Sequence, residues 1–348
     1  MSRFIGVIFV FLLTLGAECV LDERLRLDFF NIYKHAAITT REIQQDPVTP
    51  DDVTFYLYTK NNSDTYIKLN ERNLDLLHNK TIVFLIHGWI NSKDVFWYED
   101  VKNAFLKTQE DYYIVEVDWK KPAFDYYYVS SINTYDVAKI IARLIVNLNR
   151  NHGVSLDKVV VIGHSLGGQI TGFVGKRVYK QTGQKLPRII ALDPAGPLFV
   201  QRPYDKRLNK HDAEVVEVIH TDGGTFGFED ATGTIDFFPN GGNSQPGCMK
   251  IDLVDITTFI DPIPCDHFRA GEYLTEAILQ PNDFSARKCA DWDSYKEGKC
   301  EDEEVTLGNL TTKSTGKFFL ETNKSKPFAK HGSEKEGLIN KLLVVFKQ

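Results

Sequence analysis

Short apolar runs alternate with longer amphipathic stretches from about residue 80 onward. Each apolar run is continuous or nearly so, as expected of strands that are covered on both sheet faces. The pattern predicts a mostly parallel sheet with helices on both faces, which is an α/β fold. The predicted strands are 81–86, 113–117, 159–162, 189–192 and 215–219.

Two of the stretches between these runs have helical spacing. Val137, Ile141, Leu144 and Leu148 recur at i, i+4, i+7 and i+11, which places them on one face of a helix. A second helix is expected directly after residue 165, and its apolar positions are Ile170, Phe173, Val174 and Val178. Both stripes are interpreted as core.

The segments 20–75 and 281–348 lack this alternation, so we expect extra antiparallel strands and loops around the main sheet. The acidic run 301–304 is expected to be a solvated turn. The amphipathic tail 337–346 predicts a terminal helix or strand.

The composition is that of a globular protein without nucleic-acid affinity. The 348 residues are 43% hydrophobic and 25% charged, and they contain no internal repeat. The net charge is −6, and no block of Lys and Arg is present that could follow a phosphate backbone. Nucleic acid is therefore excluded as a partner.

The N-terminus predicts a secretory signal peptide over residues 1–19. Arg3 precedes an apolar run over 4–17, and Ala17-Glu18-Cys19 resembles a small-x-small cleavage site. The run is shorter than the roughly 20 residues of a membrane-spanning helix. We therefore expect a secreted, extracellular protein with one domain over residues 20–348.

Cysteine and asparagine positions agree with an extracellular route. Cleavage after Cys19 leaves four cysteines, for which pairing of Cys248 with Cys265 and of Cys289 with Cys300 is the simplest of three connectivities. The four lack the C-x-x-C spacing of a zinc site. Candidate N-glycosylation sites are Asn61, Asn79, Asn309 and Asn323.

A G-x-S-x-G motif follows the strand 159–162 and precedes a helical pattern. It reads Gly163-His164-Ser165-Leu166-Gly167, in the strand-turn-helix context that a nucleophile elbow requires. The glycines two before and two after Ser165 remove side chains that would collide in such a turn. Ser165 is therefore the candidate nucleophile.

A serine nucleophile needs a base and an orienting carboxylate, which follow it in the chain in the order Asp, His on this fold. Asp193 follows the strand 189–192, so its carboxylate should lie at the same sheet edge as Ser165. His267 is the favoured base because it lies two residues after Cys265 and opens an amphipathic stretch. Its main rival is His220 at the end of the strand 215–219; His211 and His331 lie in polar surroundings.

Ester hydrolysis also needs donors for the tetrahedral oxyanion. The backbone N–H of Leu166, the residue after the nucleophile, is one expected donor. The second is expected from Trp89 in the loop after the strand 81–86, where Gly88 permits close backbone approach. His87 in the same loop is interpreted as structural.

With these residues identified, the sequence resembles the pancreatic-lipase family of secreted neutral lipases, especially its insect members and its phospholipase A1 branch. The resemblance spans about residues 50 to 325, with its blocks in order. The matching blocks are Ile86-His87-Gly88-Trp89, 163–168, 191–197, 218–222, 236–242 and 265–269.

The resemblance implies an α/β-hydrolase fold in which Ser165, Asp193 and His267 form the triad and Leu166 and Trp89 form the oxyanion hole. It also implies that the segment between Cys248 and Cys265 is a lid. That segment mixes apolar residues with Asp252, Asp255 and Asp261, a composition suited to hiding apolar area in water and exposing it at a lipid surface.

Departures from the family pattern refine the expected function. The chain ends soon after 316–320, so we expect neither the C-terminal β-sandwich of the vertebrate lipases nor a colipase partner. The lid and the loop 223–234 look short, which is typical of the phospholipase A1 branch. Phospholipase A1 activity at a membrane, micelle or emulsion surface is therefore expected; triacylglycerol or diacylglycerol lipase is the alternative, and an inactive lipid-binding or yolk-storage protein is the alternative of another class.

Neither a cofactor nor a metal is expected. Relatives can bind a structural calcium after the catalytic acid, and the matching positions here are the Arg207 carbonyl, Asn209 and Asp212. Tyr204 and Asn209 stand where acidic residues are expected, so the negative charge at this place is reduced.

Overall fold

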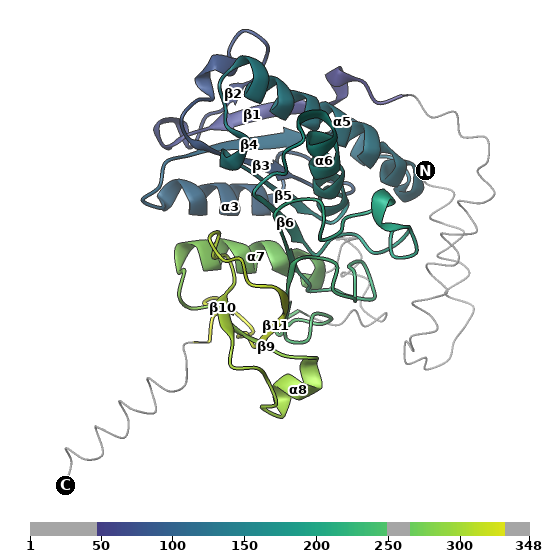
Figure 1. Ribbon diagram of the computed structural model, residues 1–348, viewed down its shortest axis with the longest axis vertical. Coiled ribbons are helices and arrows are strands. Elements are labelled where there is room, and N and C mark those ends of the chain that lie inside the picture. The colour runs from purple at the N-terminus through teal and green to yellow at the C-terminus, as the bar shows by residue number, and fades with distance from the viewer. Residues whose placement is uncertain (1–46, 249–264, 331–348) are drawn as a thin grey trace. The chain divides into compact units, whose positions relative to one another are not determined.

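The computed structural model describes residues 47–248 and 265–330 (Figure 1). The predicted signal peptide at 1–19, the predicted lid between Cys248 and Cys265 and the tail 337–346 lie outside the described residues. All the described residues belong to one compact unit by their contacts.

The described strands form one eleven-stranded sheet in the order β10-β9-β11-β8-β7-β6-β5-β3-β4-β1-β2. Five of them are the strands predicted from the apolar runs, each within one or two residues of its predicted ends. The strands are β1 (Thr54–Tyr58), β2 (Ile67–Lys68), β3 (Thr81–Ile86), β4 (Tyr112–Asp118), β5 (Val159–His164), β6 (Arg188–Leu192), β7 (Val215–Ile219), β8 (Ile235–Pro239), β9 (Ser285–Lys288), β10 (Glu304–Thr306) and β11 (Gly316–Leu320).

The centre of the sheet is parallel and its edges are antiparallel. Strands β4, β3, β5, β6, β7, β8 and β11 all pair in parallel. Strands β1 and β2 on one side and β9 and β10 on the other are antiparallel, as expected for the flanking segments. The expectation of an antiparallel surround is wrong for β11, which extends the parallel region by pairing with β8, a strand that the apolar-run analysis did not include.

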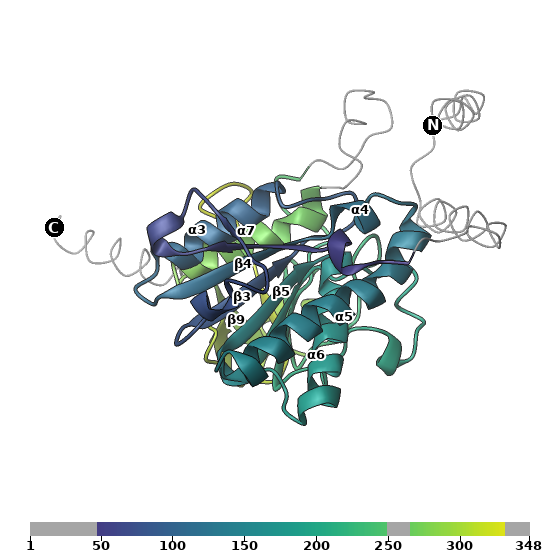
Figure 2. The same ribbon diagram turned by 90° about the horizontal axis from the view of Figure 1, so that it is seen from above.

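Helices lie on both sides of the central sheet (Figure 2). Alternate residues of β3 belong to the two different core clusters that these helices form with the sheet. On β3, Phe84 and Ile86 pack in the core cluster that contains α5 (Tyr127–Asn151) and α6 (Leu166–Thr182). Val83 and Leu85 pack instead with α3 (Phe96–Lys107) and α7 (Cys265–Leu279). Both faces of the sheet are therefore covered, and the architecture is that of the α/β-hydrolase fold.

The predicted helix stripes are mostly confirmed as core. All four predicted positions on α6 are buried, and so are Val137, Ile141 and Leu148 on α5. Leu144 is only partly buried, because the neighbouring Ile145 takes the inward position on that turn. The remaining short helices are α4 (Lys120–Ala123) and α8 (Trp292–Lys296). None of the helices in the described ranges is long and apolar enough to cross a bilayer.

A buried carboxyl group on β4 gives the fold a pH dependence. Glu116 is 2% exposed, and burial raises its pKa to about 7, although Lys102 and Lys93 favour the ionised form. The folded chain therefore holds a proton on Glu116 that the unfolded chain has released above a pH of about 4.5. Folding stability should consequently fall as the pH rises from about 5 through 7.

We expect this fall to amount to at most about 3 kcal/mol of unfolding free energy and to be absent in Glu116→Gln, which is neutral throughout. Urea unfolding of the parent and the variant at pH 5, 6, 7 and 8 measures it. A stability difference between the two proteins that does not change with pH would contradict the prediction.

Candidate active site

The candidate nucleophile occupies a strained turn between β5 and α6. Ser165 has φ 57° and ψ −121°, a conformation that non-glycine residues rarely adopt. Its N–H donates to the Leu192 carbonyl at 3.1 Å, and its own carbonyl accepts from the Ala195 N–H at 3.0 Å. These bonds tie the Ser165 turn to the turn that follows β6.

The two motif glycines are required by close backbone contacts. A Cβ on Gly163 would lie 2.3 Å from the Gly167 carbonyl oxygen, and a Cβ on Gly167 would lie 2.1 Å from the Ile86 oxygen. Real Cβ atoms do not approach backbone this closely. Gly163 is therefore required within the turn, as the motif predicts, whereas Gly167 is required by the close approach of the end of β3.

Asp193 follows β6 directly and is fully buried at 0% exposure. One carboxylate oxygen, Oδ1, accepts the backbone N–H groups of Thr221 at 2.8 Å and Asp222 at 3.0 Å. The other, Oδ2, lies 2.5 Å from Nδ1 of His267. A carboxylate only accepts hydrogen bonds, so the proton of this contact is on Nδ1, and a neutral imidazole then carries a lone pair on Nε2.

His267 is buried in the first turn of α7 and its Nε2 makes no hydrogen bond among the described residues. The expected bond from Ser165 Oγ to Nε2 is therefore not formed. The neighbour of the serine does contact His267: Nε2 of His164 donates to the His267 carbonyl at 2.8 Å, and the two rings are 4.4 Å apart. The structure thus joins Asp193 to His267 and places Ser165 next to a residue bound to His267.

The rival bases are occupied, exposed or outside the described residues. His220 is buried with Nδ1 2.8 Å from the Phe228 carbonyl and Nε2 2.9 Å from the Asp236 carboxylate, so neither nitrogen has a free lone pair for a serine. His211 is exposed on the surface, and His331 lies outside the described residues. Among the histidines of the described ranges, His267 is the one whose Nε2 is buried without a partner.

His87 is fixed as a buried structural residue. Its Nε2 accepts the Trp119 N–H at 3.1 Å, and the two rings stack with centroids 5.3 Å apart. The loop that follows it approaches the nucleophile, because a Cβ on Gly88 would lie 2.8 Å from the Ser165 Cβ.

The two expected oxyanion donors flank this approach. Leu166 is the first residue of α6, where backbone N–H groups have no partner within the helix. Trp89 is held by a hydrogen bond from its Nε1 to the Asp125 carbonyl at 2.7 Å and by edge contact with the Tyr127 ring at 5.3 Å. Both backbones therefore lie in segments that border Ser165.

Sequence reasoning missed two supports of the Asp193–His267 pair. The amides of Thr221 and Asp222 could have been found, because β7 lies beside β6 and the carboxyl ends of parallel strands meet at one edge. His164 carried no sequence signal, since the variable position of the motif accepts many residues. Burial holds its pKa well below the usual range, as expected of a neutral imidazole in the core.

One group of side chains in the described ranges has the composition of a metal site. Ligand atoms of Asp193, Asp222 and His267 lie within 4.8 Å of one another. Both Asp193 oxygens and Nδ1 of His267 are already engaged in the contacts given above. The arrangement fits a hydrogen-bonded pair better than a cation site.

The residues at which the resemblance implies a possible calcium site also do not fit a calcium ion. The ammonium of Lys176, on α6, lies 2.7 Å from the Arg207 carbonyl oxygen and 2.6 Å from both carboxylate oxygens of Asp212. Asn209 turns its amide nitrogen toward the same carboxylate, at 3.1 Å from Oδ1. A lysine side chain and an amide donor thus occupy the oxygens that a cation would need.

The close approach of α6 to this loop depends on small residues. A Cβ on Gly172 would lie 2.7 Å from Asp212 Oδ2, and one on Gly175 would lie 2.1 Å from the Asp212 carbonyl oxygen. Lys176 follows directly and closes the contact. The ammonium therefore links α6 to the loop between β6 and β7.

Replacing Lys176 with methionine should lower the unfolding free energy by up to about 3 kcal/mol, because it leaves the buried Asp212 carboxylate without its cation. Urea unfolding measures the loss, and Lys180→Met, an exposed change on the same helix, is the control and should be close to neutral.

The parent's melting temperature should be the same in EDTA and in millimolar calcium. A clear drop in EDTA would contradict this account.

Both predicted disulfides are confirmed. Cys248 is bonded to Cys265 and Cys289 to Cys300. The Cys248–Cys265 disulfide is attached to the first residue of α7, two residues before His267. The candidate glycosylation asparagines are all exposed: Asn61, Asn79, Asn309 and Asn323.

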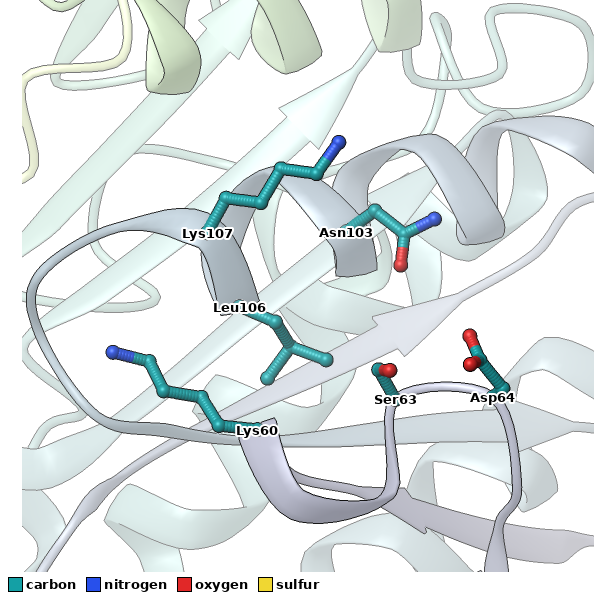
Figure 3. A pocket seen from close by; sticks show the side chains of 6 residues that line it. All are labelled: Lys60, Ser63, Asp64, Asn103, Leu106 and Lys107. Atoms are coloured by element: carbon teal, nitrogen blue, oxygen red, sulfur yellow. The ribbon is translucent and has the colours of Figure 1, made fainter.

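A pocket lies away from these residues, between the turn at Lys60–Asn62 and the end of α3 (Figure 3). It is lined by polar and charged side chains around Leu106, and Lys60 within it donates to the carbonyls of Thr108 and Gln109. None of the candidate active-site residues lines it. It therefore contributes nothing to the proposed chemistry.

The chain is similar in sequence to known lipases. A family model described as Lipase matches residues 29–328. Lipase member H-A of Xenopus laevis is 39% identical over 256 residues, covering 72% of this chain and 54% of that protein. Pancreatic triacylglycerol lipase of Mus musculus is 35% identical over 282 residues, covering 75% of this chain and 59% of that protein.

A third relative, inactive pancreatic lipase-related protein 1 of Mus musculus, is 33% identical and covers 85% of this chain and 68% of that protein. The chain thus spans between about half and two thirds of the length of these relatives. Among solved structures, the crystal structure of esterase PE8 matches at 16% identity with a TM-score of 0.30, covering 41% of this chain and 69% of that one.

Proposed function

Because the chain belongs to the pancreatic-lipase family, we propose that it is a secreted serine ester hydrolase that releases fatty acids from glycerolipids. Phospholipids are its proposed preferred substrate, cleaved at the sn-1 acyl ester. The observation that carries the proposal is the buried Asp193–His267 pair, whose Nε2 has no partner beside the strained Ser165 turn.

In the proposed reaction, Ser165 Oγ attacks the acyl carbonyl carbon while His267 Nε2 takes the hydroxyl proton. Asp193 holds the imidazole in the required tautomer and stabilises the imidazolium that forms. The backbone N–H groups of Leu166 and Trp89 donate to the oxyanion. The imidazolium then protonates the leaving glycerol oxygen, and a serine ester of the fatty acid remains.

Water completes the cycle. His267 removes a proton from a water molecule, which attacks the acyl carbon of the serine ester. The C–O bond to Ser165 breaks, the serine regains its proton from the imidazolium, and a free fatty acid leaves. The chain's own residues supply every group that these steps require.

The compact loop between β7 and β8 supports the phospholipid preference. It folds back on the Asp193 turn: Gly196 donates to the Phe226 carbonyl at 2.8 Å and Phe228 to the Pro194 carbonyl at 3.1 Å. A loop packed on the Asp193 turn is the arrangement that the proposed preference requires, because a loop that projected over Ser165 would exclude a bulky polar headgroup. The similarity to a protein named pancreatic triacylglycerol lipase supports neutral glycerides as the second candidate substrate.

Fatty-acid release from phosphatidylcholine vesicles and from emulsified triolein, measured side by side, tests the substrate assignment. We expect faster release from phosphatidylcholine and production of a lysophospholipid. Faster release from triolein would favour the second candidate. Failure of a fluorophosphonate probe to label Ser165 would instead indicate a non-catalytic lipid-binding protein. The similarity to inactive pancreatic lipase-related protein 1 makes this class the alternative to test.

The predicted signal peptide at 1–19 and the two disulfides support secretion, because disulfides persist in oxidising compartments. The exposed sequon asparagines are proposed glycosylation sites on the same grounds. Asn323 is the least suited of the four, since its side-chain nitrogen already donates to the carbonyls of Pro327 and Ala329.

A further inference from the structure

An exposed apolar surface covers the start of α5 and the turn before it. Thirteen large hydrophobic side chains are exposed among the described residues, and five of them fall within residues 124–135. Single exposed hydrophobic residues are common on globular proteins, but such a cluster is not. The aromatic surface, as we name it, consists of Phe124, Tyr126, Tyr128, Ile132 and Tyr135.

The spacing within the aromatic surface shows that it is continuous along the helix. Tyr128, Ile132 and Tyr135 lie at i, i+4 and i+7, so they form one stripe on α5. Tyr126 immediately precedes the helix and is the most exposed of the five, at 73%. The stripe is about 10 Å long at the helical rise per residue.

This surface is attached to the loop that carries a proposed oxyanion donor. Trp89 donates from its indole to the Asp125 carbonyl, and the Ile90 N–H donates to the Ala123 carbonyl at 3.0 Å. The Tyr127 ring, between two exposed tyrosines, packs against Trp89. A partner seated on the aromatic surface is therefore held beside the proposed catalytic residues.

Cations lie at the rim of the aromatic surface. The Lys120 ammonium is 5.5 Å from the Phe124 ring centre, and the Arg177 guanidinium is 4.1 Å from that of Tyr135. Two carboxylates, Asp125 and Asp136, lie in the same stretch, so the surface carries little net charge.

We propose that the aromatic surface is the site through which the protein binds a zwitterionic phospholipid bilayer. Aromatic side chains favour the boundary between headgroups and acyl chains, where one part of the ring is apolar and another is hydrated. Arginine and lysine beside them match the phosphate groups at the same depth, and the small net charge suits a surface without net charge. The inference deepens the proposed function, on which it rests.

The test uses phosphatidylcholine vesicles and the full chain carrying Ser165→Ala, so that binding is measured without hydrolysis. Tyr126→Ala/Tyr128→Ala/Ile132→Ala should weaken vesicle binding by about tenfold or more, because three apolar side chains no longer enter the interface. The matched control is Leu76→Ala/Tyr179→Ala/Leu279→Ala, which removes similarly exposed side chains elsewhere and should bind as the parent does.

With Ser165 intact, both triple variants should hydrolyse a water-soluble short-chain ester at the parent rate, which shows that they are folded. Unchanged vesicle binding by the Tyr126/Tyr128/Ile132 variant, or an equal loss in the control, would overturn the proposed membrane surface. Because the binding assay needs no catalysis, it gives its answer even if the parent hydrolyses no ester and the proposed enzymatic function fails.

Discussion

Replacing Ser165 with alanine is expected to lower kcat for ester hydrolysis by about a millionfold. The change removes the oxygen that attacks the acyl carbon, and none of the other proposed residues can replace it as the nucleophile. The remaining rate should reflect only binding and the oxyanion donors. Fatty-acid release under substrate saturation measures the effect.

The structure predicts that this loss is purely chemical. The turn at Ser165 is held by its backbone bonds to Leu192 and Ala195, which alanine retains. Thermal unfolding should therefore be nearly unchanged. Ser155→Ala, at an exposed serine before β5, is the control and should keep full activity. Activity within a hundredfold of the parent in Ser165→Ala would refute the proposed nucleophile.

Asp193→Asn should lower kcat by about ten-thousandfold while leaving the fold in place. The amides of Thr221 and Asp222 both donate to Oδ1, so the asparagine should place its carbonyl oxygen there. Its NH₂ group then faces His267 Nδ1, which must become an acceptor. The imidazole proton moves to Nε2, where it blocks transfer from Ser165.

The neighbouring acid provides a sharp comparison. Asp222 lies within 4.8 Å of the same His267 and Asp193 ligand atoms, so it is the other carboxylate that could orient the imidazole. Asp222→Asn should lower kcat by less than about tenfold, because Asp193 already holds Nδ1. A larger loss in Asp222→Asn than in Asp193→Asn would assign the orienting role to Asp222.

Local sequence patterns were sufficient to predict the central elements. The apolar runs located β3 to β7 because strands covered on both faces are apolar at nearly every position. They did not separate β8 and β11 from the surrounding segments. Parallel pairing of β11 with β8 joins residues about 80 apart, and no short-range pattern specifies such a pairing.

The sequence proposes the residues of the site, whereas their contacts come from the structure. Ser165 and Asp193 follow adjacent parallel strands, whose carboxyl ends meet at one edge. His267 stays the proposed base, and His220 is the weaker candidate because the Asp236 carboxylate and the Phe228 carbonyl occupy both His220 nitrogens. That occupation depends on β7 lying beside β8, which spacing alone did not show.

By itself, the sequence determined the strand and the helix on either side of Ser165 and the apolar core stripes, because these follow from the spacing of apolar residues over a few positions. Only the tertiary structure decided that Asp193 meets His267 across 74 residues, that Lys176 holds Asp212, and that the stripe of Tyr128, Ile132 and Tyr135 stays exposed. The physical reason is range: backbone conformation and amphipathicity act over a few residues. Hydrogen-bond partners and solvent exposure instead depend on which distant segments the sheet order brings together.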